Sequence, residues 1–286
     1  MAESGTLYIV ATPIGHPEDV TLRALRVLGE VDRIAAEDTR SAARLLARHD
    51  IRTPLISCHE HNERDRLETL LAGLRAGDSL ALVSEAGTPA VSDPGFPLVR
   101  AAVAEGMRVV PVPGPSAAVA ALSVSGLPTD AFTFLGFPPR KAAARRKFLE
   151  PVKALPHTLI FYESPHRLSR LLADLVDVLG DRDAVLGREM TKPYEEFVRG
   201  ALTEIARAMD RTGGVKGECT LLVAGASGTA ESDIDLRELV TRAMKRPGAT
   251  VSGVAKDISK EYGLPRKAVY AEALNVRENE EKNGQS

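Results

Sequence analysis

Short apolar runs alternate with helical patterns from residue 6 to about residue 135, and this alternation constrains the fold most strongly. The apolar runs are Leu7–Val10, Arg33–Ala36, Leu55–Ile56, Leu80–Val83, Val109–Val110 and Phe132–Leu135. Segments between them, such as 21–28, 41–47, 64–74 and 97–104, repeat apolar residues three and four positions apart. Helices that cover a sheet have this spacing. The pattern therefore predicts an α/β fold with a mostly parallel sheet and helices on its faces.

Two breaks divide the chain into three expected domains. Phe137-Pro138-Pro139 interrupts the alternation, and a second series of strands and helices follows it. The small residues of 225–230 are typical of a flexible linker, after which short helices are expected over 236–244, 251–262 and 266–274. We predict an N-terminal α/β domain over residues 1–137, a second α/β domain over 138–225, and a linker with a C-terminal helical domain over 226–286.

Composition favours a soluble cytoplasmic protein. The formal net charge is only -2, so any basic surface must be a local patch. Cys58 and Cys219 form no disulfide framework, which fits a reducing compartment. The first residues lack a basic segment followed by an apolar one, and no apolar run approaches the roughly 20 residues that span a bilayer. No membrane partner is expected.

The stretch best suited to hold a ligand is Ser84–Gly95, directly after the apolar run that ends at Val83. Its glycines permit backbone angles closed to other residues, and Pro89 and Pro94 fix φ. Open α/β sheets bind ligands at the carboxyl ends of their strands, where small residues let the backbone approach the ligand. A long ordinary turn is the alternative. The loop over 11–21 has neither a Walker sequence nor GxGxxG, so phosphate cradling there is not expected.

Seven segments, taken together and in order, resemble the tetrapyrrole methylase superfamily. They are 11–15 with 19–24, 36–40, 84–95, 113–117, 134–140 and 161–167. Within that superfamily they resemble the branch that methylates small-subunit ribosomal RNA. The resemblance runs from residue 6 to about 225, and the C-terminal helices are similar to the extra domain of that branch.

The resemblance implies a methyltransferase that holds S-adenosylmethionine between two α/β domains, forms a homodimer, and methylates the 2′-oxygen of a cytidine ribose in the decoding region of 16S rRNA. Relatives that act on porphyrin precursors carry other loops at 12–15 and 85–88, which argues against a tetrapyrrole substrate. Carried over position by position, the cofactor contacts fall on Pro13, Ile14, Glu85, Ala86, Gly87, Ala90, Ser116, Ala117, Tyr162 and Gly225.

A base would help a ribose hydroxyl attack the methyl group. Glu37 and Asp38 follow the expected strand at 33–36, and the resemblance favours Glu37, with Asp38 as its rival. Asp38 would equally serve as a helix N-cap. His61 is a candidate for placing the hydroxyl or exchanging its proton. A metal site at Cys58, His59 and His61 would lack a second ligand pair, so no metal is expected.

Contacts with rRNA, free or in the assembled small subunit, would need basic side chains. The densest basic run includes Arg140, Lys141, Arg145 and Arg146, in which Lys141 and Arg145 share one side of a helix. Arg40, Arg167 and Lys192 complete the expected substrate contacts, and a solvated helix face is the alternative for the run.

Two other functions stay open at this stage. One is methylation of a tetrapyrrole or another small molecule. The other is a nucleic-acid-binding regulator that uses the C-terminal helices, because the turn at 263–265 resembles that of a helix-turn-helix.

Overall fold

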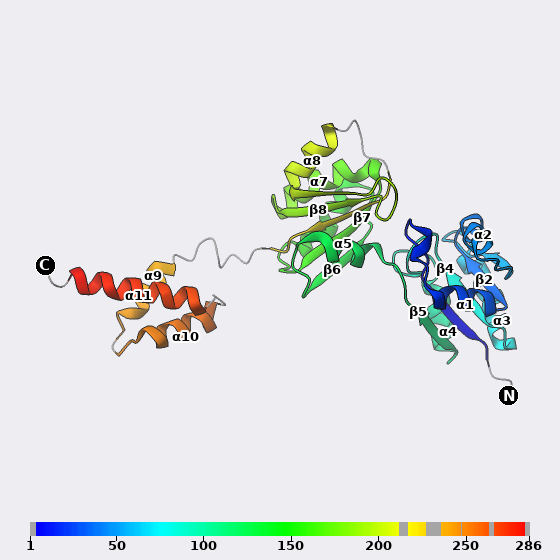
Figure 1. The fold of residues 1–286 in the computed structure, drawn as a ribbon, viewed down its shortest axis with the longest axis horizontal. Helices are drawn as coiled ribbons and strands as arrows, with labels where there is room; N and C mark the ends of the chain where they lie inside the picture. The colour runs from blue at the N-terminus through cyan, green and yellow to red at the C-terminus, as the bar shows by residue number, and fades with distance from the viewer. Residues whose placement is uncertain (1–3, 212–216, 227–235, 247, 263–265, 284–286) are drawn as a thin grey trace. The chain divides into compact units, whose positions relative to one another are not determined.

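The computed structural model describes residues 4–211, 217–226, 236–246, 248–262 and 266–283. Its contacts divide the chain into two compact units, residues 1–225 and residues 226–286. Each unit is described separately, and Figure 1 gives the element labels.

The first unit begins with a five-stranded sheet in the order β3-β2-β4-β1-β5, in which all paired strands are parallel. Its strands are β1 (Thr6–Val10), β2 (Arg33–Ala36), β3 (Leu55–Ser57), β4 (Leu80–Val83) and β5 (Arg108–Val112). Its helices are η1 (Pro17–Asp19), α1 (Leu22–Glu30), α2 (Thr39–Arg48), α3 (Glu63–Ala76) and α4 (Phe96–Ala104). The predicted parallel sheet is confirmed.

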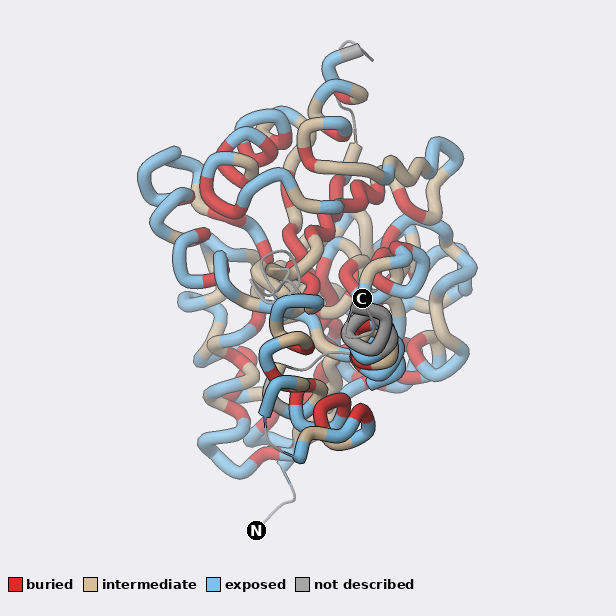
Figure 2. Tube along the Cα trace, turned by 90° about the vertical axis from the view of Figure 1, so that its left-hand side faces the viewer, coloured by how far each residue is buried: buried red, intermediate tan, exposed pale blue. Residues whose placement is uncertain are grey.

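Both faces of this sheet are covered. Leu28 of α1 and Leu46 of α2 pack with Ile34 and Val83 in one apolar cluster. Leu71 of α3, with Leu98 of α4, belongs to a second cluster that contains Leu7 and Leu82. Neighbouring residues of one strand point to opposite faces, so the two helix pairs lie on opposite sides of the sheet. Figure 2 shows which stretches of the chain are buried and which are exposed.

A second five-stranded sheet follows, in the order β6-β7-β10-β8-β9. Its strands are β6 (Phe132–Gly136), β7 (Thr158–Glu163), β8 (Asp183–Arg188), β9 (Glu196–Ala201) and β10 (Cys219–Val223). Only the pairing of β6 with β7 is parallel. The helices of this region are α5 (Ala117–Ser125), α6 (Ala142–Leu149), η2 (Glu150–Val152), α7 (Pro165–Leu179) and α8 (Leu202–Arg211).

The sequence pattern predicted that the strand at 132–136 belongs to the first sheet, but it does not. It pairs with β7, and the first sheet ends with β5 at Val112. Helix α5 also packs on the second sheet, where Ala121 contacts the cluster of Ile160 and Leu222. The change of sheet therefore lies before the predicted boundary at residue 137. A local apolar run identifies a strand but not the strand with which it pairs.

The C-terminal unit contains α9 (Leu236–Met244), α10 (Val251–Tyr262) and α11 (Arg266–Asn283). They share an apolar core that includes Val240, Ala255, Ile258, Val269 and Ala273. The last helix continues past the predicted end at residue 274. The turn at 263–265, on which the helix-turn-helix comparison rested, lies outside the described residues. No helix in the described part of the chain has the length and apolarity needed to cross a bilayer.

Four other segments hold the loop between β4 and α4, residues 84–95. Thr12 exchanges two backbone hydrogen bonds with Gly87, at 2.9 and 3.1 Å. The backbone N–H of Glu85 donates to Glu37 Oε2 at 3.0 Å, and that of Gly95 donates to Glu63 Oε2 at 2.9 Å. Thr88 Oγ1 donates to the carbonyl oxygen of residue 115 at 3.1 Å. The loop is thus fixed on the carboxyl edge of the first sheet.

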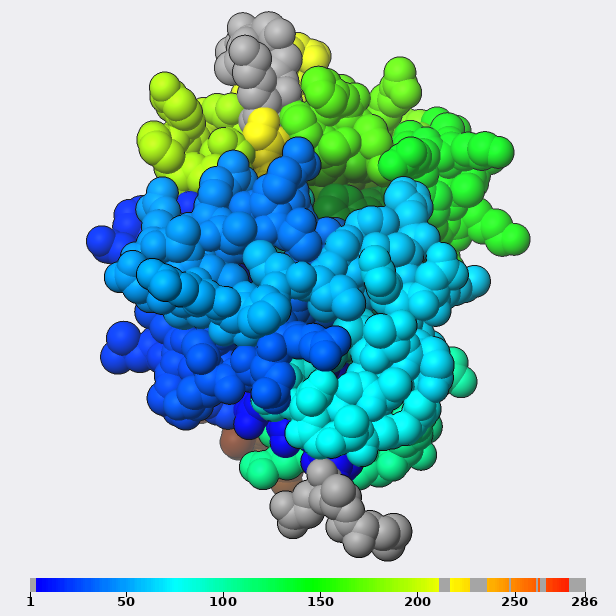
Figure 3. Space-filling model, turned by 90° about the vertical axis from the view of Figure 1, so that its right-hand side faces the viewer, coloured from blue at the N-terminus to red at the C-terminus, as the bar shows by residue number. Residues whose placement is uncertain are grey.

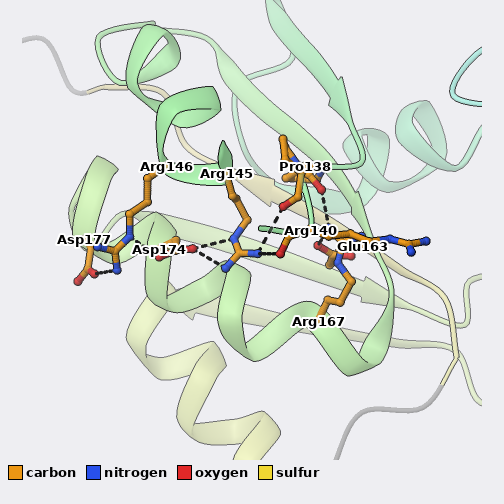
Figure 4. A network of polar contacts seen from close by, with 9 residues as sticks. Pro138, Arg140, Arg145, Arg146, Glu163, Arg167, Asp174 and Asp177 are labelled. Carbon is orange, nitrogen blue, oxygen red and sulfur yellow. Dashed lines mark hydrogen bonds and ion pairs between the residues drawn. The ribbon is translucent and has the colours of Figure 1, made fainter. Parts of the chain in front are cut away.

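Helix α6 carries the basic run expected to contact RNA, but its arginines are bonded inside the protein (Figure 4). The side chain of Arg145 is only 4% exposed, and its Nε lies 2.7 Å from Asp174 Oδ2. Arg146 donates to Asp174 Oδ1 at 2.7 Å and to Asp177 Oδ2 at 3.0 Å. These bonds join α6 to α7.

Arg167 is engaged in the same region. It pairs with the buried carboxylate of Glu163 at 3.0 Å and donates to the carbonyl oxygen of Pro138. The guanidinium groups of Arg145, Arg146 and Arg167 therefore have protein partners, and their contact with RNA stays a prediction. The acidic partners are distant in sequence, so the basic run gave no indication of them. Arg140 and Lys141 are exposed.

Removing the shared acceptor of α6 should destabilise the first unit. We expect Asp174→Asn to lower the free energy of unfolding by about 3 kcal/mol, because it leaves the buried charge of Arg145 without its counter-ion. Asp177→Asn removes only the exposed partner of Arg146 and should have little effect. Urea unfolding followed by circular dichroism measures both. Equal losses in the two variants would contradict a structural role specific to Asp174.

Candidate active site

A pocket of about 460 Å³ lies between the two sheets of the first unit. It is bounded by the carboxyl ends of β2 and β4, the start of α5, the end of β7 and the start of β10. Its volume falls in the range of sites that enclose a small molecule. Figure 3 shows the recess between the blue and cyan region of the first sheet and the green and yellow region of the second.

Most of the expected cofactor residues meet here. The pocket is lined by Ile14, Glu85, Ala86, Gly87, Ser116, Ala117 and Tyr162. Pro13 lines a second pocket, of about 290 Å³, whose wall also includes Ile14, Glu85 and Ala86. Ala90 lines neither pocket; its φ of 65° shapes the loop that carries the other residues.

Gly225 does not lie at this site. Strand β10 begins beside the pocket at Cys219 and runs away from it, antiparallel to β7. Gly225 follows the far end of β10, where an added Cβ would lie 2.1 Å from the carbonyl oxygen of Pro156. Strand direction places this glycine at the opposite end of β10 in a closely packed turn, and its contact with the cofactor stays a prediction.

Tyr162 is held where the two sheets meet. Its hydroxyl accepts a hydrogen bond from the backbone N–H of Ala118 at 3.1 Å, which ties β7 to the first turn of α5. Its ring packs edge-on against Phe134 and Phe137, at centroid distances of 4.9 and 5.5 Å. Ala86, Gly87, Ser116 and Ala117, which have small side chains or none, line the same pocket as this ring.

Close packing at Gly15 brings the first loop against the second half of the unit. An added Cβ would lie 2.6 Å from Lys192 Cγ and 2.9 Å from the carbonyl oxygen of Met190. The backbone N–H of His16 donates to Thr191 Oγ1 at 2.9 Å. Only glycine fits this approach, which holds the first loop against residues 190–192.

Three carboxylates without a described cationic partner line the larger pocket: Glu37, Glu85 and Asp93. Burial, and next the negative charge of Glu37, raises the pKa of the Asp93 carboxyl to about 6, although a hydrogen bond from Ser84 opposes the rise. Glu163, Glu189 and Glu218 also line this pocket, but each pairs with Arg167 or Lys192. The pocket favours a positively charged ligand.

The three candidate bases differ in where they lie and in what they contact. Glu37 lines the pocket. Asp38 instead caps α2: its Oδ1 accepts from the backbone N–H groups of Arg40 and Ser41, at 2.8 and 3.2 Å, and these bonds hold its pKa below the ordinary value. His61 is exposed and lines neither pocket. The contacts of Asp38 are therefore those of a helix N-cap, the alternative role considered for it.

Sequence reasoning missed Asp93 and Glu63. Asp93 belongs to the loop already selected as a ligand site, where an Asp before Pro-Gly is typical of a turn. Glu63 lies in the segment 57–63, where β3 ends at Ser57 and the chain turns into α3. Its hydrogen bond from Gly95 crosses 32 residues, and no local pattern indicates it.

Two expected substrate contacts remain, Lys192 and Arg40, and they lie in different surroundings. Lys192 lines both pockets and pairs with Glu189 at 2.9 Å and with Glu218 at 3.3 Å. Arg40 is 90% exposed, 3.5 Å from Asp38. Among the described residues, no group of three or more His, Cys, Asp and Glu side chains is placed to hold a metal ion.

Comparison with known proteins gives the family. The family model described as Tetrapyrrole (Corrin/Porphyrin) Methylases matches residues 6–206. A protein of Micromonospora olivasterospora is 47% identical over 270 residues, covering 94% of this chain and 86% of its own. One of Pseudomonas aeruginosa is 47% identical over 276 residues, covering 92% and 98%. Both are named ribosomal RNA small subunit methyltransferase I.

Solved structures agree on the fold. Uroporphyrin III C-methyl transferase of Thermus thermophilus has a TM-score of 0.55 at 24% identity and covers 76% of this chain and 97% of its own. Another structure of that Thermus enzyme, with a TM-score of 0.55 at 23% identity, is complexed with S-adenyl homocysteine and covers 77% and 97%. These structures confirm the predicted fold class, and the family model with the two relatives confirms methyl transfer as the reaction class. The chain belongs to the tetrapyrrole methylase family and, within it, to the group of ribosomal RNA small subunit methyltransferase I.

Proposed function

We propose that this protein uses S-adenosylmethionine to methylate the 2′-oxygen of a cytidine ribose in 16S rRNA of the small ribosomal subunit. The relatives named above support the substrate class, and the acidic pocket between the two sheets carries the proposal because it suits a cationic methyl donor. Ribosomal RNA is a cytoplasmic substrate, so we place the protein in the cytoplasm.

The residues of the larger pocket fit the cofactor. Its volume of about 460 Å³ suits a ligand of this class. Ala86, Gly87, Ser116 and Ala117 would hold the cofactor against the backbone, with Tyr162 opposite. When bound, S-adenosylmethionine supplies a methyl group on a positively charged sulfur. The unpaired carboxylates beside it would favour that charge by Coulomb attraction.

We propose Asp93 as the group that accepts the proton of the ribose hydroxyl. It faces the pocket, and its raised pKa makes it a stronger base than an ordinary aspartate while leaving it ionised at neutral pH. Glu37 has another task in this arrangement. Its Oε2 accepts from the backbone of Glu85 and so positions the loop, and its charge helps to raise the pKa of Asp93.

The reaction itself is tested with undermodified small ribosomal subunits and methyl-labelled S-adenosylmethionine. We expect label in 2′-O-methylcytidine after digestion of the rRNA to nucleosides. Free 16S rRNA, tested in parallel, shows whether the assembled subunit is required. Label in a base, or no label in RNA despite measurable cofactor binding, would contradict the proposed function.

The role of Asp93 predicts a pH dependence. Only its ionised form accepts a proton, so the single-turnover rate should fall about tenfold per pH unit as pH drops below about 6. Asp93→Asn should lower the rate by roughly 10²- to 10⁴-fold, the usual contribution of a general base.

Glu37→Gln is the matched variant. Glutamine still offers an oxygen to the Glu85 N–H, so the plateau rate should change little. Loss of the charge should lower the pKa of Asp93 and move the acid limb to lower pH. The assignment is reversed if Glu37→Gln abolishes transfer while Asp93→Asn retains it, with cofactor affinity intact in both.

We further propose a homodimer. Helix α5 contains no charged residue, and its Val119 and Val124 are 55% and 48% exposed. Phe96 and Val103 of α4 are also exposed, at 61% and 60%. Exposed apolar side chains that recur on neighbouring elements of the chain support burial against a second copy.

Sedimentation equilibrium should give a dimer for the wild-type chain and a monomer for Val119→Lys, because burying an unpaired charge at an apolar interface is costly. Leu22→Lys, which changes an 87% exposed leucine of α1, should remain a dimer. A wild-type monomer at micromolar concentration would refute this assembly.

A further inference from the structure

Helix α2 carries three exposed basic side chains in one row, defined here as the arginine row: Arg40, Arg44 and Arg48. They are four residues apart, so they follow one side of the helix at intervals of about 6 Å along its axis. Arg44 and Arg48 line the second pocket, together with Ser41. The row therefore lies directly beside a cavity.

The cations of this row are not used to hold the fold together. Among the described residues, the side chains of Arg44 and Arg48 have no hydrogen bond or ion pair, and that of Arg40 has only its 3.5 Å contact with Asp38. Like charges four residues apart destabilise a helix slightly. A row of them at the edge of a pocket thus needs an explanation other than stability. The basic run of α6 differs, because Arg145 and Arg146 are bonded to α7.

The second pocket adjoins the cofactor pocket. The two cavities share a wall that consists of Ile14, Glu85, Ala86, Lys192 and Glu218. The cofactor pocket contains unpaired carboxylates, which repel phosphate groups. A ribose that enters it can do so only if its neighbouring phosphates are held outside, and the arginine row provides positive charge next to the shared wall.

We propose that the arginine row and the second pocket bind the phosphodiester backbone beside the target nucleotide of a single-stranded polyribonucleotide. This inference rests on the proposed function, because it assigns the path of the RNA to that same site. Arg44 and Arg48 each contact a phosphate, and Arg40 extends the path toward the end of α2 that follows Glu37 and Asp38. A linear row suits a linear polyanion better than a single phosphate group.

The test is the variant Arg44→Gln/Arg48→Gln, in which glutamine keeps a good helix former at both positions. Binding of a fluorescently labelled oligouridylate is measured by anisotropy between 50 and 200 mM KCl. Each phosphate contact to a single strand contributes about 0.7 to the slope of log affinity against log salt. We expect the slope to become shallower by about 1.4 and the affinity to fall roughly 10- to 30-fold near 0.1 M salt.

Matched variants separate this contact from general charge and from misfolding. Lys153→Gln/Arg170→Gln removes the same charge from exposed positions that line neither pocket, and it should bind as the wild type does. Arg44→Lys/Arg48→Lys should recover most of the affinity and the salt slope. Affinity for S-adenosylmethionine, measured by calorimetry, should be unchanged in all of these variants.

Two readouts distinguish failure of this inference from failure of the proposed function. Wild-type methylation of small subunits tests the function, whereas oligouridylate binding tests the arginine row without any methyl transfer. Unchanged binding by Arg44→Gln/Arg48→Gln, or equal loss in Lys153→Gln/Arg170→Gln, overturns the inference even if methylation occurs. So does a wild-type chain that does not bind the oligouridylate.

Discussion

The candidate site depends on the hydrogen bonds that hold residues 84–95 to the rest of the first unit. Thr12 fixes the loop to the segment after β1, and Glu37 and Glu63 fix it to those after β2 and β3. Each of these bonds satisfies a backbone group that the loop could not satisfy by itself. The carboxyl edges of separate parallel strands thereby become one surface. The positions of Glu85, Gly87 and Asp93 follow from that surface.

Charge divides this surface into two parts. Glu37 and Asp93 line only the cofactor pocket, whereas Arg44 and Arg48 line only the adjoining pocket. A methyl donor with a sulfonium charge and an RNA backbone have opposite requirements, and the proposed function needs both ligands at once. Separate pockets with a shared wall meet that need, because neither ligand has to enter the field that repels it. The small net charge of the whole chain, -2, does not reveal this division.

The sequence predicted the strands and helices of the first sheet well, because buried parallel strands are short apolar runs and their covering helices are amphipathic. It failed at the strand of 132–136, whose partner is β7 rather than a strand of the first sheet. The same limit applied to Gly225: proximity in the chain to a strand near the site did not give the direction in which that strand runs. Pairing and direction are long-range properties, whereas periodicity is local.

Site residues were predictable where they lie in loops of unusual composition, and less so where their role depends on a distant partner. Asp93 was overlooked because its chemistry depends on burial and on the charge of Glu37, neither of which spacing reveals. The basic run of α6 also has distant partners that the local sequence does not indicate. Arg145 and Arg146 on α6 donate to Asp174 on the neighbouring helix α7, so their charges are paired within the protein. What makes an arginine available to a phosphate is the absence of a nearer carboxylate, and the sparser row on α2 meets that condition better than the dense run does.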